Sequence, residues 1–369
     1  MRIDRVEVRR LDMEMKEPFE TSFGVEQRKS FLLVRVASGS SEGWGESVAG
    51  DAPLYSEETT ETCAHMLRDF LIPALLGQEI AHPDEAHRLW AFVRGNNMAK
   101  AVLDGALWDL YARQEGRSLA RVLGGVKKKV PVGISLGIEA RIEDLLEKIA
   151  LRLEQGYRRI KVKIKPGWDL QVMEAIRKRF GEIALMADAN SAYSLSDLDR
   201  LKALDDFGLT MIEQPLAYHD ISEHAKLQRE LRTPICLDES IHSAADAQTA
   251  IELGGCRIIN LKIGRVGGLT PSRQLHDLCI RHGVPLWCGG MLEAGVGRAH
   301  NVAVATLAGF ALPGDTAASS RYWYEDIIEP EVTVGPDGYI TVPTGPGLGY
   351  TPILHRIERH TVAREVFKA

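Results

Sequence analysis

The strongest constraint on the fold is an alternation that begins near residue 130. From there on, short apolar runs alternate with longer stretches in which apolar residues recur at helical spacing. This pattern is typical of βα units, which place parallel strands in one sheet with helices outside it. A closed (β/α)8 barrel needs eight such units, and the sequence offers eight. The runs are residues 130–136, 160–164, 184–187, 209–212, 235–237, 258–261, 285–288 and 310–312.

The remaining sequence predicts a smaller α+β unit that caps the barrel. Residues 3–10 and 31–37 read as strands, and residues 43–46 read as a turn into a short strand. Residues 98–113 have the apolar spacing of a helix that ends near Gly116. We therefore expect a capping domain over residues 1–125, a barrel over 126–320, and a segment over 321–369 that returns to the cap.

Composition excludes several classes of protein. The net charge is −6, with acidic and basic residues interspersed, so no basic stripe favours nucleic acid as a partner. No secretion signal or long apolar stretch occurs, which predicts a cytoplasmic protein without membrane contact. The five cysteines are scattered and form no CxxC pair, so they predict buried thiols rather than a zinc site or disulfides.

Five of the central apolar runs are followed by a charged residue at nearly constant spacing. These residues are 25, 25, 25 and 24 positions apart, which is one βα unit each: Lys163, Asp188, Glu213, Asp238 and Lys262. The carboxyl ends of barrel strands surround the active site, so the five side chains are expected to converge there. Three carboxylates without histidine favour Mg²⁺, or Mn²⁺, and predict no organic cofactor. A metal of this kind would bind the carboxylate of a small substrate and stabilise an enediolate.

The lysines suggest proton transfer. Lys161 and Lys163 share one parity on a strand and point to the same side, and crowding of cations with desolvation would let Lys163 act as a base. Lys262 is expected across the barrel mouth, on the opposite face of the substrate. A different class of enzyme, a metal-free aldolase that uses Lys262 as a Schiff base, stays open at this point. Residues expected to support the central ones are Asn190, Glu239 and Arg265.

The motifs KxK, DxN, EQP, DES and LKIGRVGG, at these spacings, resemble the muconate-lactonizing-enzyme subgroup of the enolase superfamily. Later segments, GGMLEAGVGRAHN and LPGDTAASSRYW, are most similar to o-succinylbenzoate synthases and N-succinylamino acid racemases. No histidine stands at the seventh strand as in mandelate racemases, and the eighth lacks the DxD of dipeptide epimerases.

This resemblance implies a (β/α)8 barrel with Mg²⁺ on Asp188, Glu213 and Asp238, Lys163 as acid and base, and Lys262 opposite. The implied reaction is the syn dehydration of 2-succinyl-6-hydroxy-2,4-cyclohexadiene-1-carboxylate in menaquinone biosynthesis, with or without N-succinylamino acid racemisation. A dedicated N-acylamino acid racemase is the alternative. A homo-oligomer is expected from its frequency among enzymes. Candidate pocket residues are Phe19, Ser22, Phe23, Ser135, Met291 and Glu293.

Overall fold

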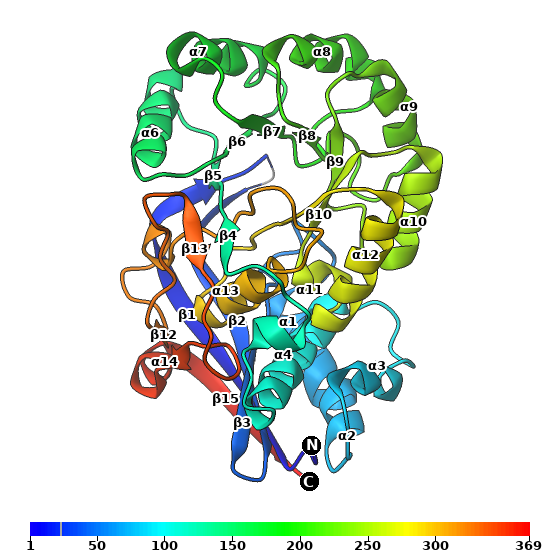
Figure 1. The fold of residues 1–369 in the computed structure, drawn as a ribbon, viewed down its shortest axis with the longest axis vertical. Coiled ribbons are helices and arrows are strands. Elements are labelled where there is room, and N and C mark those ends of the chain that lie inside the picture. The colour runs from blue at the N-terminus through cyan, green and yellow to red at the C-terminus, as the bar shows by residue number, and fades with distance from the viewer. Residues whose placement is uncertain (23) are drawn as a thin grey trace.

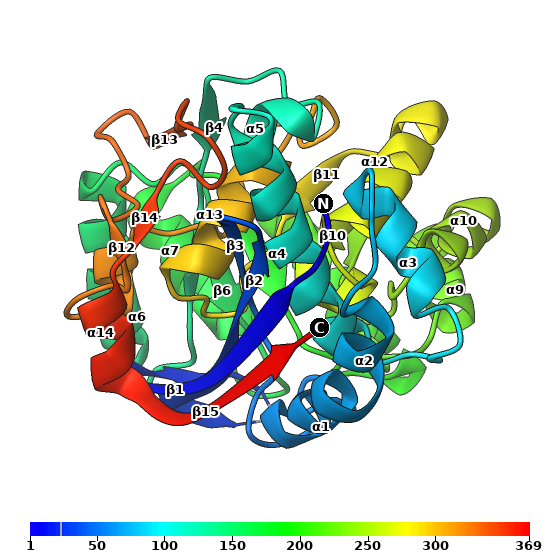
Figure 2. The same cartoon turned by 90° about the horizontal axis from the view of Figure 1, so that it is seen from below.

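An antiparallel sheet forms the cap. The computed structural model describes residues 1–22 and 24–369, and its four-stranded sheet has the order β15-β1-β2-β3. The strands are β1 (Arg5–Glu20), β2 (Val25–Ser38), β3 (Ser41–Glu46) and β15 (Thr361–Lys368). Because β15 pairs with β1, the C-terminal segment returns to the cap as predicted (Figures 1 and 2). Residues 43–46 lie within β3 rather than in a turn, since the chain reverses at Gly39 and Ser40.

Helix α4 (Asn97–Gln114) packs against this sheet and is almost wholly buried. It covers the helix predicted over 98–113, and Gly116 follows its end with a left-handed φ of 64°. The close approach depends on two glycines of β3, because a Cβ at Gly43 or Gly45 would collide with backbone atoms of α4. The cap therefore has its own core between sheet and helix, in which Leu32, Val34, Leu103 and Leu107 take part.

A curved parallel sheet forms the barrel. Its seven strands follow in chain order, each paired with the next in parallel, and Figure 1 shows helices outside them. The strands are β5 (Ile134–Leu136), β6 (Ile160–Lys163), β7 (Leu185–Asp188), β8 (Ile212–Glu213), β9 (Ile235–Leu237), β10 (Ile258–Leu261) and β11 (Leu286–Cys288). They coincide with seven of the eight predicted runs, although the first run divides. Its beginning forms β4 (Lys129–Pro131), which pairs with β13 (Tyr339–Thr341).

The eighth run differs from its prediction. Residues 310–312 form no strand in the structure; the seam between β11 and β5 is bridged by the backbone just beyond them. Asp315 N donates to Cys288 O at 2.8 Å, and Gly133 N donates to Gly314 O at 2.7 Å. Gly314 permits this approach, since a Cβ there would lie 2.8 Å from Cys288 O. The closing contact is thus a single β-bridge, Val132 with Gly314, too short to be recognised from an apolar run.

The other elements surround these two sheets. Outside the barrel strands lie α6 (Ile142–Glu154), α7 (Leu170–Phe180), α8 (Leu198–Ala203), α9 (Ser222–Glu230), α10 (Ala244–Leu253), α11 (Ile263–Val266), α12 (Leu269–His282) and α13 (Gly295–Val304). Elsewhere lie α1 (Thr60–Met66), α2 (Ile72–Leu75), α3 (Ala86–Leu89), α5 (Leu119–Val122), β12 (Ile328–Glu329), β14 (Thr351–Pro352) and α14 (Leu354–His360). In residues 1–22 and 24–369, no helix is long and apolar enough to span a membrane. The domain boundaries at 125 and 320 stay a prediction.

Candidate active site

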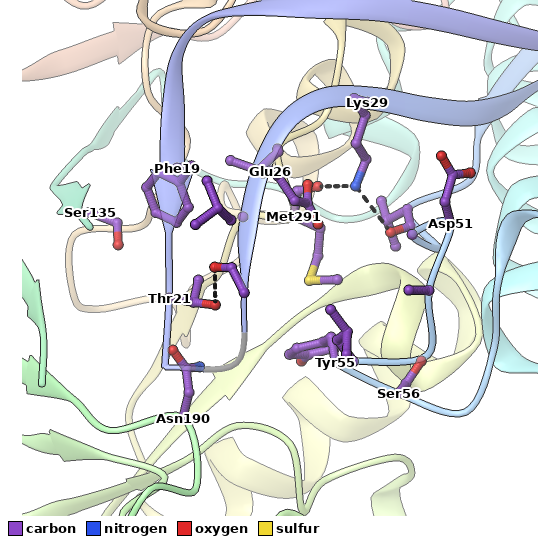
Figure 3. Close-up of a pocket in the computed structure, with 18 of the residues that line it drawn as sticks. Phe19, Thr21, Glu26, Lys29, Asp51, Tyr55, Ser56, Ser135, Asn190 and Met291 are labelled. Atoms are coloured by element: carbon purple, nitrogen blue, oxygen red, sulfur yellow. Dashed lines mark hydrogen bonds between the residues drawn. The ribbon is translucent and has the colours of Figure 1, made fainter. Parts of the chain in front are cut away.

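A cavity of about 300 Å³ lies between the cap and the carboxyl ends of the barrel strands. From the barrel it is lined by Lys161, Lys163 and Lys262, and from the cap by residues that include Phe19 and Tyr55. Figure 3 shows that its walls come from β1 and β2 on one side and from barrel loops on the other. The cavity therefore needs both parts of the fold.

The strand ends bring the predicted charged residues together. Lys163, Asp188 and Glu213 are the last residues of β6, β7 and β8, and the register pairs Lys163 with Asp188 and Asp188 with Glu213. Asp238 follows directly after β9, and Lys262 follows directly after β10. All five are buried. The spacing of one βα unit thus becomes one step around the barrel.

Ion pairs link these side chains into one network. Lys163 Nζ lies 2.6 Å from Asp188 Oδ2 and 2.6 Å from Asn190 Oδ1. Lys161 Nζ lies 3.1 Å from Asp188 Oδ2 and 3.0 Å from Glu213 Oε2. Because one ammonium reaches both carboxylates, the ends of β7 and β8 face the same small space.

The second lysine lies further round the barrel. Lys262 Nζ is 2.8 Å from Asp238 Oδ2, and the ring of Tyr55 lies beneath it with its centroid at 4.3 Å. Lys262 follows β10 and contacts Asp238, whereas Lys163 ends β6 and contacts Asp188. Both lysines line the same cavity. A substrate in this cavity can therefore have an amine on either side.

The surroundings separate the proton affinities of the three lysines. Burial, together with repulsion from Lys161, lowers the pKa of Lys163 below its ordinary value, although Asp188 opposes the change. Burial would also lower the pKa of Lys161, but the carboxylates of Asp315 and Glu213 raise it above the usual range. Lys161 therefore stays a cation, while Lys163 is the amine best able to accept a proton.

Burial also acts on Lys262, but Tyr55 and Glu239 outweigh it and raise its pKa. Arg265, one of the residues expected to support the central ones, binds Asp238 through Nη1 and donates to Ile241 O through Nε. What Arg265 can do is fix Asp238, and through it the position of the lysine.

The carboxylates have the chemistry of ligands for a hard divalent cation. Burial would raise the pKa of Asp188, but Lys163 and Lys161 hold it below the usual range, whereas burial and the nearby Asp188 raise the pKa of Glu213. Buried carboxylates of this kind require cations around them, and the set of oxygen donors suits Mg²⁺. In the structure their cationic partners are Lys161, Lys163, Lys262 and Arg265. Within residues 1–22 and 24–369, no three His, Cys, Asp or Glu side chains are arranged as a metal-holding group.

Two further residues stand beside the carboxylates. Asn190 donates through Nδ2 to Glu239 Oε1 at 2.9 Å while its Oδ1 accepts from Lys163. Asn260 donates to Glu213 Oε1 at 2.6 Å. Among the described residues, Glu239 Oε2 and Asn260 Oδ1 are buried without a hydrogen-bond partner. These two unpaired oxygens could bind a cation directly or accept hydrogen bonds from its bound water.

The predicted pocket residues fall into three groups. Phe19, Ser135 and Met291 line the cavity, and all three are labelled in Figure 3. Ser22 donates to Asn190 O at 3.2 Å, so it joins the β1–β2 loop to the barrel. Glu293 is buried beside the cavity, where it accepts from Met291 N at 2.9 Å. Phe23 lies outside the described residues.

Sequence reasoning missed several side chains that contact the network, among them Asn260, which contacts Glu213, and Asp315 and Tyr55. Asp315 accepts from Arg159 at 2.7 Å and lies 2.7 Å from Lys161 Nζ. A signal for it existed, because Asp315 follows the eighth apolar run as the other carboxylates follow theirs. Tyr55 donates to Asp238 Oδ1 at 3.0 Å from an irregular segment of the cap, where no periodicity marks it.

Comparisons with known proteins agree with this geometry. Residues 144–355 match the family "Enolase C-terminal domain-like", and residues 5–124 match "Mandelate racemase / muconate lactonizing enzyme, N-terminal domain". The chain is 58% identical to an o-succinylbenzoate synthase of Geobacillus stearothermophilus, over 99% of this chain and 97% of that one. It is 51% identical to an N-succinylamino acid racemase of Thermus thermophilus, over 100% of both.

Solved structures extend the similarity to the whole fold. A member of the enolase superfamily from Listeria innocua superposes with a TM-score of 0.96 at 40% identity, and the match covers 100% of this chain and 99% of that one. A muconate lactonizing enzyme of Pseudomonas fluorescens, complexed with muconolactone, superposes with a TM-score of 0.92 at 25% identity, covering 98% and 99%.

Proposed function

Because this chain belongs to the mandelate racemase and muconate lactonizing branch of the enolase superfamily, we propose that it is an o-succinylbenzoate synthase. The reaction is the syn dehydration of 2-succinyl-6-hydroxy-2,4-cyclohexadiene-1-carboxylate. The observation that carries the proposal is the cavity lined by Lys163, with its lowered pKa, and by Lys262, a cation, from opposite parts of one barrel rim. The 58% identity to the Geobacillus stearothermophilus synthase, over 99% of this chain, supports this reaction among those of the family.

Lys163 performs both proton transfers in this proposal. Its neutral amine takes the proton from the carbon next to the substrate carboxylate, and the ammonium then gives that proton to the departing hydroxyl, which leaves as water. Asn190 and Asp188 hold the amine through contacts of 2.6 Å each. One base suffices because both events occur on the same face of the ring.

Lys161 and Lys262 act as fixed charges. Lys161 is held by Asp315 and Glu213 and repels a proton on Lys163, which keeps the base ready. Lys262 stands where negative charge develops on the substrate and stabilises it as a cation. The family implies a divalent metal ion. We propose Mg²⁺ on Asp188, Glu213 and Asp238, where it would supply positive charge to the substrate carboxylate.

A second activity is favoured by a specific observation. Racemisation needs an amine on each side of the substrate, and both Lys163 and Lys262 line the cavity. The Thermus thermophilus racemase at 51% identity supports the same reading. The chain would then racemise N-succinylamino acids as a side activity. The aldolase alternative loses its basis, because a metal-free Schiff base has no use for the buried carboxylates of Asp188, Glu213 and Asp238, and both family models match the enolase superfamily.

The test compares two single substitutions in two assays. Lys163→Ala removes the proposed base and should lower kcat/KM for dehydration by at least about 100-fold, in the range known for general bases. Lys262→Ala should abolish the racemisation of an N-succinylamino acid, measured as the loss of optical rotation, while leaving some dehydration; deuterium uptake from D₂O should then be restricted to the enantiomer whose α proton faces Lys163. Dehydration at the wild-type rate in Lys163→Ala would end the assignment. The ratio of the two wild-type kcat/KM values decides which reaction the site favours.

A further inference from the structure

We propose that the ammonium of Lys29 binds a second carboxylate of the substrate, at the end of its succinyl chain. The inference rests on the proposed function, because it concerns the same cavity. It deepens that function by assigning the cavity to dicarboxylates. Lys29 belongs to β2 of the cap, and it lines the cavity beside Met291 of the loop after β11.

The first argument is an incomplete set of partners. Lys29 is only 4% exposed, and its Nζ donates to Met291 O at 3.0 Å and, at the longer distance of 3.4 Å, to Val48 O. An ammonium has three protons, so one is left for another acceptor. Among the described residues, Lys29 forms no ion pair, in contrast to Lys161, Lys163 and Lys262. A buried cation with only neutral acceptors is costly unless an anion joins it.

The second argument is position. In Figure 3, Lys29 and Asn190 lie on opposite sides of the view, with Thr21 and Met291 between them. Asn190 contacts Lys163 and so marks the catalytic end. A substrate that places one carboxylate at that end extends toward the cap, where the succinyl chain of either proposed substrate carries its other carboxylate. Two cations of β2 line the cavity, Arg28 and Lys29; Arg28 is already paired with Asp12, which leaves Lys29 as the candidate among the described residues.

The acidic residues of the cap that line the same cavity are Glu26, Asp51 and Glu58. Asp51 lies 3.4 Å from Arg10, and Glu58 accepts from the backbone N–H groups at the start of α4, at 2.9 and 3.1 Å. Glu26 also lines the cavity, and its Oε2 is buried without a partner in the described part of the chain. Glu26 is thus the one carboxylate that could compete with a ligand for Lys29, so it enters the test.

The experiment uses two substrates that differ only in charge. Racemisation is followed by deuterium uptake for an N-succinylamino acid and for its terminal amide, in which CONH₂ replaces the distal carboxylate. Lys29→Met removes the charge at nearly constant length. It should lower kcat/KM for the succinyl substrate by about 10- to 100-fold, mainly by raising KM, as expected for the loss of a charge-assisted hydrogen bond. The kcat/KM for the amide should barely change. Lys29→Arg should recover part of the preference.

Controls separate binding from structural damage. Lys226→Met removes an exposed cation of α9 and should change neither substrate. Glu26→Gln removes the competing carboxylate and should keep or increase the preference for the succinyl substrate. Equal losses for both substrates in Lys29→Met would overturn the proposal, because they indicate a general role in joining cap and barrel. A ratio of kcat/KM for the succinyl substrate to kcat/KM for the amide that is the same in Lys29→Met and in the wild type would overturn it as well.

A failure of the proposed function is distinguishable from a failure of this inference. If the wild-type protein turns over neither substrate, calorimetric titration with o-succinylbenzoate and with its terminal amide replaces the kinetic assay. Tighter binding of the dicarboxylate that disappears in Lys29→Met would support the role of Lys29 without any turnover. Equal affinity for the two ligands in the wild-type protein would refute it.

Discussion

The substitution Asp315→Asn tests the buried network that holds Lys161. Asp315 is 8% exposed, and its carboxylate contacts Arg159 and Lys161 at 2.7 Å each. Burial would raise its pKa, but these two cations lower it from the ordinary 3.8 to about 2. The shift corresponds to about 2 kcal/mol of stability, and breaking a buried ion pair commonly costs about 3 to 5 kcal/mol. Because Lys161 keeps Asp188 and Glu213 as partners, we expect a loss near the lower end, about 3 kcal/mol.

Urea unfolding at pH 7 measures this loss, as the shift in midpoint multiplied by the m value. Asp337→Asn is a matched control, since that carboxylate also pairs with a lysine at 2.8 Å but is 45% exposed, and it should have little effect. The folded pKa of Asp315 is below its unfolded value, so its contribution is complete above 3.8 and is lost as the pH falls through about 2. A midpoint for Asp315→Asn equal to that of the wild type would refute the reasoning.

Three further outcomes follow from the contacts described. Tyr55→Phe removes the hydroxyl that reaches Asp238 and should lower kcat/KM by about 10-fold, whereas Tyr218→Phe, at a 48% exposed ring, should leave it unchanged. Chelation with EDTA should abolish dehydration and added Mg²⁺ should restore it; full activity without metal would contradict the proposed ligands. Gly45→Ala forces a Cβ into the backbone of α4 and should lower the unfolding free energy by about 1 to 3 kcal/mol, while Gly50→Ala, with its nearest atom at 3.5 Å, should cost much less.

The barrel and its charged rim were predictable because a repeat converts sequence distance into position around an axis. Lys163, Asp188 and Glu213 are one unit apart in the chain and occupy adjacent strand ends in the structure. No such rule relates the cap to the barrel. Tyr55 and Lys29 reach the cavity only because of how α4 and the cap sheet sit over the strands, which depends on packing between distant segments.

The seam of the barrel was unpredictable for another reason. An apolar run predicts a strand only when backbone pairing extends over several residues, and the seam is made by one bridge between Val132 and Gly314. Local sequence carries almost no information about a contact of that length. Asp315 follows the eighth apolar run, and its position just past the seam places it against Lys161.

The pairing of β15 with β1 has a consequence for biosynthesis. β1 ends at Glu20, yet the strand beside it begins only at Thr361, so a ribosome makes the entire barrel before the sheet can be finished. Until then one side of β1 exposes unpaired amide and carbonyl groups, the kind of edge to which other nascent chains attach. A truncated chain that ends before β15 should therefore aggregate during expression, and this effect should precede any effect on catalysis.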